Sequence, residues 1–146
     1  MARVRTRVES HPAAYTRLYD SAAVGNNMFL RGLRVETRAK QNLNLNTPRR
    51  VDTGRLRARV GTTRIRVNVN GIMVRGARVG TRVFYGRFVH EGTGLYGPKK
   101  RLIVPKRAKA LRFKPKGEAG FIYVRSVKGM KPNRFLTDAI PAAKLG

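Results

Sequence analysis

The sequence VDTGRLRARV, residues 51–60, leaves a polar turn and then alternates arginine with apolar residues. A period of two is typical of a β-strand, because successive side chains of a strand point to opposite faces. We therefore expect a strand whose residues Leu56, Ala58 and Val60 face a core. Gly54 tolerates a positive φ and can begin the strand after the turn. The outward side chains of this strand would be Arg55, Arg57 and Arg59.

The same alternation returns downstream in RIRVNVN, residues 64–70, where Ile65, Val67 and Val69 take the apolar positions. Asn-Gly at the end of this stretch is a strong hairpin signal, so we expect strands over residues 63–69 and 72–79. Two neighbouring strands would then carry arginines on one shared, outward face. The predicted DNA-facing residues are Arg55, Arg57, Arg59, Arg64 and Arg66.

Composition indicates one globular domain with a partner of opposite charge. The chain has 146 residues, of which 41% are hydrophobic, so it can bury a core. Its 33 Lys and Arg against 7 Asp and Glu give a net charge of +26. A compact state with that charge favours a polyanionic or acidic partner. No cysteine is present, which excludes disulfides and thiolate metal sites.

Helical spacing of apolar residues predicts a long helix over residues 13–43. Ser10-His11-Pro12 supplies a capping hydroxyl and a first-turn proline. We expect Gly25-Asn26-Asn27 to kink or break this helix. Residues 1–9 alternate arginine with valine and threonine and form either an edge strand or a basic arm, and the basic N-terminal arm as a whole is expected over residues 1–12. We divide the chain into this arm and a single domain over residues 13–146.

The second half of the chain predicts short elements. Aromatic and aliphatic residues at helical spacing favour a short helix over residues 83–91, and a last amphipathic helix over residues 134–143. Short strands fit residues 102–104, 111–113 and 121–127. The predicted fold class is α+β, with a long N-terminal helix packed on a mostly antiparallel sheet, a short central helix and a C-terminal helix.

A glycine-rich loop, GTGLYG at residues 92–97, formally matches a dinucleotide-binding fingerprint. That motif needs a strand before it and a helix after it, and here a predicted helix precedes it and Pro98 with two lysines follows. We therefore interpret the stretch from Gly92 to Arg101 as a flexible basic surface loop that can become ordered against a neighbouring subunit. The residues predicted to contact a neighbouring subunit are Gly92, Thr93, Gly94, Leu95, Tyr96, Lys99, Lys100 and Arg101.

His90-Glu91 is the one pair with the residue types of an acid-base or metal site. Such a site needs several ligands, or a nucleophile held by a base, and the only other histidine is His11 in an unrelated segment. We expect no catalytic residue, no metal ligand and no cofactor. Glu91 is expected to pair with a nearby arginine.

The arginine-rich face allows three interpretations. It can be a solvated sheet face, it can reflect the coding composition of the source genome, or it can hold phosphates bidentately. None of the arginine positions is interleaved with aromatic residues, which favours duplex backbone or a protein partner over single strands. A membrane partner is not expected, because no apolar run approaches the ~20 residues of a spanning helix and the first seven residues lack the apolar segment of a signal peptide.

The order of motifs along the chain resembles a known family. The motifs are VDTGRL at 51–56, YGRFVHEGT at 85–93, IVP at 103–105, ALRF at 110–113 and KPNRFL at 131–136. In this order they resemble the head-tail joining proteins of tailed phages, which are also called neck, tail-completion or minor tail components. The resemblance covers most of the chain.

The resemblance implies a small α+β structural protein without catalysis or cofactor. Such a protein forms a homo-oligomeric ring, expected to be six- or twelve-fold, between the portal or head-completion proteins and the tail of a siphovirus-type virion. Double-stranded DNA passes through the ring. The protein would be assembled in the host cytoplasm and located at the head-tail junction. Two alternatives stay open: a tail terminator of the same virion, and a free basic nucleic-acid-binding protein of ribosomal or nucleoid type.

Overall fold

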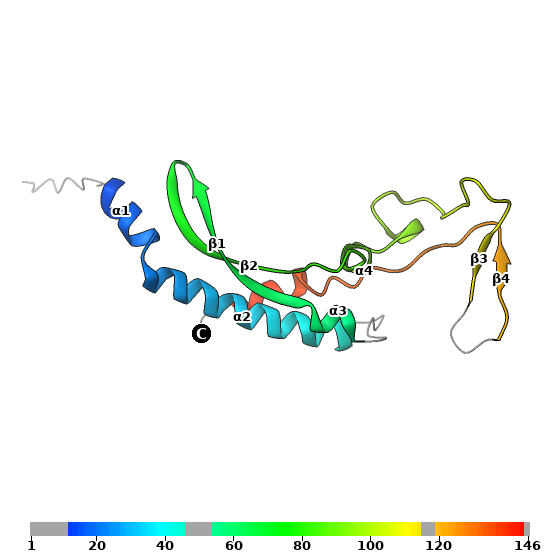
Figure 1. Cartoon of the computed structure of the whole chain (residues 1–146), viewed down its shortest axis with the longest axis horizontal. Coiled ribbons are helices and arrows are strands. Elements are labelled where there is room, and N and C mark those ends of the chain that lie inside the picture. Colours follow the sequence, from blue (N-terminus) through cyan, green and yellow to red (C-terminus); the bar gives the residue numbers. More distant parts are fainter. Residues whose placement is uncertain (1–11, 46–53, 115–118, 145–146) are drawn as a thin grey trace, which may run out of the picture.

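The computed structural model describes residues 12–45, 54–114 and 119–144. A long helix packs on a two-stranded antiparallel sheet, which confirms the predicted α+β class (Figure 1). The predicted basic arm, apart from its last residue, and the Asp52-Thr53 turn lie outside the described residues.

Two helices begin the described chain, α1 over Pro12–Tyr19 and α2 over Ala22–Leu45. They are separated at Asp20 and Ser21. The Ser21 hydroxyl accepts a hydrogen bond from the backbone N–H of Val24 at 3.3 Å. A hydroxyl that satisfies a free amide of the first turn is typical of a helix start, so this serine explains where α2 begins.

The predicted break at residues 25–27 is wrong, because this segment lies inside α2. Gly25 is buried, and a Cβ built on it would come 2.9 Å from Cδ of Arg75 in the sheet. The glycine therefore provides room for a contact between helix and strand and does not interrupt the helix.

The hairpin predicted around Asn-Gly is confirmed, and both strands are longer than expected. Strand β1, Val60–Val69, pairs antiparallel with β2, Ile72–Thr81. Asn70 and Gly71 have φ angles of 51° and 84°, the left-handed pair that a two-residue type I′ turn requires. The side chain of Asn68 accepts a hydrogen bond from the Gly71 amide at 2.8 Å.

The strand predicted for residues 55–59 is wrong. Arg55–Ala58 form a short helix, α3, which follows Gly54 at a φ of 74°. Leu56 and Val60 are buried as expected, but Ala58 is exposed. Leu56 and Val60 are four residues apart, which also fits one face of a helical turn, so the short alternation did not distinguish the two structures.

The arginine-bearing face of the hairpin lies against the helices and does not point away from them. Gly32 of α2 packs against Thr62 of β1 and Ala77 of β2. Thr62 also donates a hydrogen bond to the carboxylate of Glu36 at 2.7 Å. We call this the inner face of the hairpin, and its register places on it Thr62, Arg64, Arg66, Arg75, Ala77 and Val79.

The opposite face is therefore the apolar one, and no described element covers it. We call it the outer face, and toward the turn it carries Ile65, Val67, Val69, Ile72 and Val74. Val67 and Val69 are 43% and 50% exposed. The expectation that these side chains face a core within the chain is wrong. Arginine can replace them on the inner face because its aliphatic stem packs on the helix while its charge reaches a polar partner.

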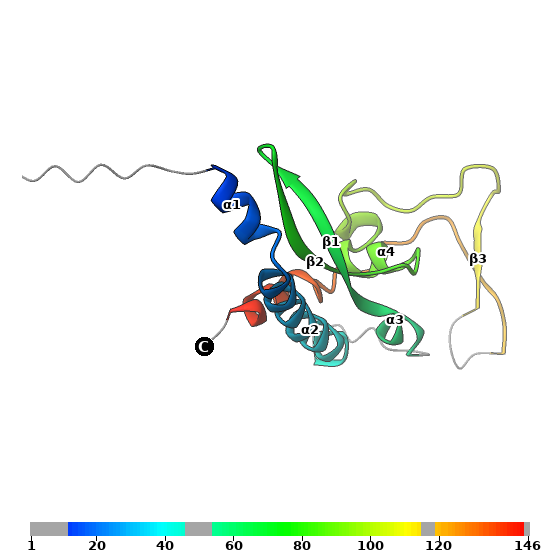
Figure 2. The ribbon, with the colours of Figure 1, turned by 60° about the vertical axis from the view of Figure 1, so that its left-hand side comes forward.

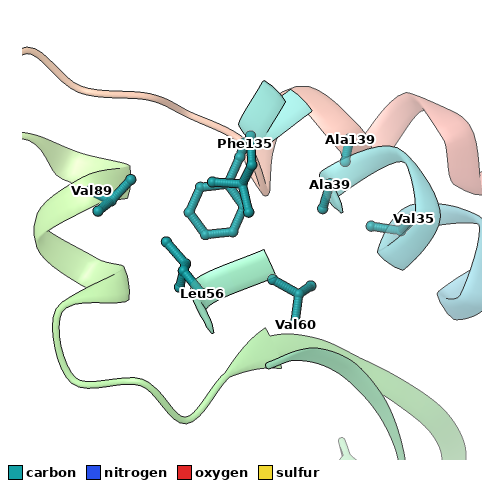
Figure 3. Packing of buried hydrophobic residues seen from close by; sticks show 8 residues of the cluster. Val35, Ala39, Leu56, Val60, Val89, Phe135 and Ala139 are labelled. Carbon is teal, nitrogen blue, oxygen red and sulfur yellow. The ribbon is translucent and has the colours of Figure 1, made fainter. Parts of the chain in front are cut away.

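The core is small and lies where α2, α3, the base of the hairpin and the C-terminal segment meet. Figure 3 shows the ring of Phe135 above Leu56, with Val89 on one side of it and Val60 on the other. The buried hydrophobic residues are Val35, Ala39, Leu43, Leu56, Val60, Val89, Phe135 and Ala139.

The remaining elements are short: α4 (Gly86–Glu91), the 3-10 helix η1 (Gly94–Tyr96), and strands β3 (Leu111–Phe113) and β4 (Ile122–Val124). The strand predicted for residues 102–104 is reduced to a single bridge, from Ile103 to Val127.

The predicted C-terminal helix is a 3-10 helix, η2, over Thr137–Ala143 with Pro141 inside it. Proline supplies no amide for an α-helical hydrogen bond, which accounts for the difference. Of the apolar residues in the predicted helix over residues 134–143, Phe135 and Ala139 are buried, whereas Ile140 is 60% exposed.

Candidate nucleic-acid interface

The five arginines predicted to face DNA do not form one continuous row. Arg55 and Arg57 lie on α3, and Arg59 follows it, whereas Arg64 and Arg66 lie on the inner face of β1. All five are exposed. They belong to separate surfaces, because a helical turn replaces the first predicted strand.

Asp20 partly neutralises the middle of the inner face. Arg66 and Arg75 are directly opposite each other on the two strands. Their Nε atoms lie 3.3 Å and 3.0 Å from the same Oδ1 of Asp20. Like charges in this position repel, and the carboxylate from the α1–α2 junction separates them. Arg66 therefore has a structural role between the helices and the hairpin.

Arg64 is held by polar and aromatic contacts and not by an acid. Its Nη1 donates a hydrogen bond to Oδ1 of Asn26 at 2.8 Å. Its guanidinium lies 4.4 Å from the centre of the Phe29 ring. A cation–π contact orients the guanidinium but leaves its full charge, so Arg64 remains able to attract an anion.

A basic hollow of about 540 Å³ lies at the base of the outer face. Arg59, Arg78 and Arg82 line it together with Thr63 and Ile65. None of the three arginines forms an ion pair with an acidic residue in the described part of the chain. Three arginines around one hollow can bind phosphate oxygens. The sequence predicted Arg59 as a DNA-facing residue but not Arg78 and Arg82. Arg78 lies in the predicted strand over residues 72–79 and precedes Val79, and Arg82 follows that strand by three residues and precedes Val83.

The first part of the glycine-rich loop is held by its own chain and is not free. The amide of Thr93 donates to the Met130 carbonyl at 2.9 Å, and the amide of Leu95 donates to the Lys128 carbonyl at 2.8 Å. Gly94 and Gly129 have φ angles of 63° and 87° where the two segments touch. The glycines therefore serve a close backbone contact, and the expectation of a flexible loop is wrong for residues 92–97.

Five of the residues predicted to contact a neighbouring subunit nevertheless have exposed side chains. Lys99, Lys100 and Arg101 are exposed, and Leu95 and Tyr96 are 44% and 39% exposed. Contact of these residues with a neighbouring subunit stays a prediction.

His90 lies beside a second hollow of about 330 Å³, near Thr137 and Arg134. Its Nε2 is 3.0 Å from the Thr137 hydroxyl, and its ring packs edge-on against Phe135. Burial lowers the pKa of His90 below its usual value, against the raising effect of the nearby carboxylates. Neutral His90 thus fits a packing role beside the core.

Glu91 pairs with an arginine as expected. Its Oε2 lies 2.9 Å from Nε of Arg87, which is one helical turn away on the exposed side of α4. Within residues 12–45, 54–114 and 119–144, no group of three His, Cys, Asp or Glu side chains could hold a metal ion.

Comparisons with protein-family models, with curated proteins and with solved structures found no match. Among the described helices, none is long and apolar enough to cross a membrane.

Proposed function

We propose that this chain is a structural subunit of a phage head-tail connector, which forms a closed ring around double-stranded DNA. The order of motifs from VDTGRL to KPNRFL supports the proposal through the resemblance described above. The observation that carries it is the uncovered apolar outer face of the hairpin.

A chain that folds to act alone rarely leaves so much apolar surface open. Among the described residues, eight hydrophobic side chains form the core, whereas twenty-one large hydrophobic residues are exposed. The exposed ones include Val67 and Val69, which stand on a regular strand with their backbone already paired to β2. Another copy of the chain that packs on this face would bury both valines and give the hairpin a second covering layer, opposite the helices.

A head-to-tail contact between identical copies closes into a ring when its rotation permits, and a ring gathers the charge of every copy around one axis. A net charge of +26 per chain favours a polyanion at that axis. The alternative of a free basic nucleic-acid-binding protein is supported by Arg59, Arg78 and Arg82 in the outer hollow, which form no ion pair within the described residues. It predicts tight binding by an isolated monomer.

The test is electron microscopy of particles produced from the source genome with this reading frame deleted. DNA-filled heads beside detached tails are the expected result. Normal joined virions would overturn the proposal and favour the free nucleic-acid binder.

Complementation with Val67→Asp and Val69→Asp tests whether the apolar outer face of the hairpin is needed for assembly. Both side chains are exposed, so each variant should fold as a monomer, with an unchanged circular dichroism spectrum, and fail to restore joined particles. Asn68→Asp, also exposed on β1 but on the inner face, is the matched control, because a carboxylate can still accept the hydrogen bond from the Gly71 amide.

A further inference from the structure

One part of the chain projects from the body and has no core of its own. From here on, the arm means residues 97–114 and 119–128, and not the basic N-terminal residues 1–12. Strands β3 and β4 form a separate two-stranded sheet at its end. Figures 1 and 2 show this sheet far from α1, joined to the body by two extended segments. None of the buried core residues comes from the arm.

Nearly all charged residues of the arm are basic. Residues 97–128 contain eleven Lys and Arg and one acid, Glu118, in the sequence. Neither residues 92–114 nor residues 119–137 contain a carboxylate side chain. The exposed basic residues of the arm are Lys99, Lys100, Arg101, Lys106, Arg107, Lys109, Arg112, Lys114, Arg125 and Lys128. A thin element with this charge repels itself, and a polyanion in contact with it removes that repulsion.

Arg112 lies over an aromatic ring at the end of the arm. Its guanidinium lies 3.8 Å from the centre of the Phe121 ring and 6.0 Å from that of Tyr123, its cross-strand partner. All three residues are exposed, so this cluster does not stabilise a core. A planar guanidinium that lies on a ring keeps its N–H groups at its edges, where they can bind two phosphate oxygens at once.

The same contact favours phosphate over stacked bases as the ligand. Base stacking needs an open aromatic face, and the guanidinium of Arg112 already occupies one face of Phe121. The third aromatic residue, Phe113, is one position from Arg112 and therefore points to the other side of the two-stranded sheet, so the three rings do not form one stacking surface. A two-stranded ribbon also fits the major groove of B-DNA, which is ~12 Å wide.

We propose that the arm binds the phosphate backbone of double-stranded DNA, without reading sequence, and that Arg112 is its bidentate phosphate ligand. The inference rests on the proposed function for the identity of the polyanion, and it moves the DNA contact from the predicted arginine row to the arm. Its test uses purified protein, so it can succeed or fail independently of particle assembly.

The experiment measures binding of the full chain to a labelled duplex of random sequence and to a single strand of equal length, at several salt concentrations. The first variant is Lys99→Gln, Lys100→Gln and Arg101→Gln together. The control removes the same charge from the exposed surface of the helices, with Arg17→Gln, Arg34→Gln and Arg38→Gln. Circular dichroism checks that both triple variants fold, and analytical ultracentrifugation checks that both keep the oligomeric state of the unchanged chain, because Lys99, Lys100 and Arg101 are also predicted to contact a neighbouring subunit.

We expect the arm variant to bind the duplex at least tenfold more weakly, with a salt slope reduced by ~0.9 for each lost phosphate contact. The helix control should lose much less affinity. Equal losses in the two triple variants would overturn the proposal, because net charge and not the arm would then determine binding.

Arg112 is tested with Arg112→Lys and Arg112→Gln. Lysine keeps the charge but loses the planar fork, so we expect severalfold weaker duplex binding for lysine and a larger loss for glutamine. Binding by Arg112→Lys as tight as by the unchanged chain would overturn the bidentate role. The choice of duplex backbone would be overturned if the unchanged chain bound the single strand more tightly than the duplex and Phe121→Leu removed this preference, because base stacking would then determine binding.

Discussion

Gly32 of α2 lies so close to Thr62 of β1 that a Cβ built on the glycine would come 2.6 Å from Cγ2 of the threonine. Ala77 on β2 would be 3.0 Å away on the other side. The helix therefore reaches the two-stranded sheet through a position without a side chain. This close approach also brings Glu36, one turn further along α2, within hydrogen-bond distance of Thr62.

Gly32→Ala should destabilise the chain although alanine is the better helix former. The added methyl group must displace two side chains on the hairpin, and overpacking of this kind costs about 1–3 kcal/mol. Urea unfolding followed by circular dichroism measures the loss.

Gly80→Ala is the matched control for this substitution. Gly80 lies in β2, its φ is not positive, and nothing lies within 4 Å of a Cβ built on it. A free energy of unfolding that falls equally in both variants would contradict the close contact between α2 and the hairpin.

Asp20→Asn should weaken the attachment of the hairpin to the helix junction. Without the carboxylate, Arg66 and Arg75 repel each other across the strands. All three side chains are about a third or more exposed, so we expect a loss of only ~1 kcal/mol at low salt. The loss should shrink as salt screens the repulsion, which unfolding at about 0.02 M and 0.5 M salt would measure.

Glu91→Asn provides a comparison in an exposed one-turn pair with Arg87. Such pairs contribute ~0.3–0.5 kcal/mol, so its effect should be smaller than that of Asp20→Asn. A salt-independent loss in Asp20→Asn would show that the carboxylate acts through something other than its charge.

Local signals in the sequence were sufficient where the chain decides its structure locally. Asn70-Gly71 predicted the hairpin, because a left-handed pair of residues is a property of the turn itself. Leu56 and Val60 were correctly placed in the core, yet the structure around them was predicted wrongly. Five residues of alternation fit a strand, and the i, i+4 pair within them fits a helical turn equally well.

The sequence could not determine which face of the hairpin meets the helix. The expected rule places apolar side chains inside, but Ile65 and Val67 lie on the face that no described element covers. The inner face is decided by tertiary contacts that no local pattern contains: glycines on α2 that admit Arg75 and Thr62, and a carboxylate at the junction. An apolar strand face can pack within its own chain or against another chain, and the pattern in one sequence does not distinguish these two arrangements.

Asn42→Ala should remove a buried link between α2 and the C-terminal segment. The Asn42 side-chain amide donates a hydrogen bond to the Phe135 carbonyl at 3.2 Å, and Asn42 is only 3% exposed. Loss of the donor leaves a buried carbonyl without this partner, which costs about 1–3 kcal/mol. Urea unfolding measures the effect, and Gln41→Ala, on the exposed side of the same turn, is the control with an expected change within ~0.5 kcal/mol. Equal effects of the two substitutions would contradict the role of Asn42.

His90 should make stability depend on pH in the acidic range. Burial lowers its pKa in the folded chain, while the nearby charges of Glu91 and Asp138 raise it and that of Arg134 lowers it further. The unfolded chain therefore binds a proton at a higher pH than the folded chain, so stability increases with pH where His90 titrates. The contribution is fully present above the ordinary value of 6.5 and is lost as the pH falls from there through the folded pKa.

His90→Gln keeps an amide that can contact the Thr137 hydroxyl but cannot titrate. We expect its melting temperature to change less between about pH 7 and pH 5 than that of the unchanged chain. His11 and every carboxylate are present in both proteins, so their effects cancel in the comparison. Parallel melting curves across this pH range would show that the folded chain accepts a proton on His90 without cost, and that the edge-on packing against Phe135 does not depend on a neutral ring.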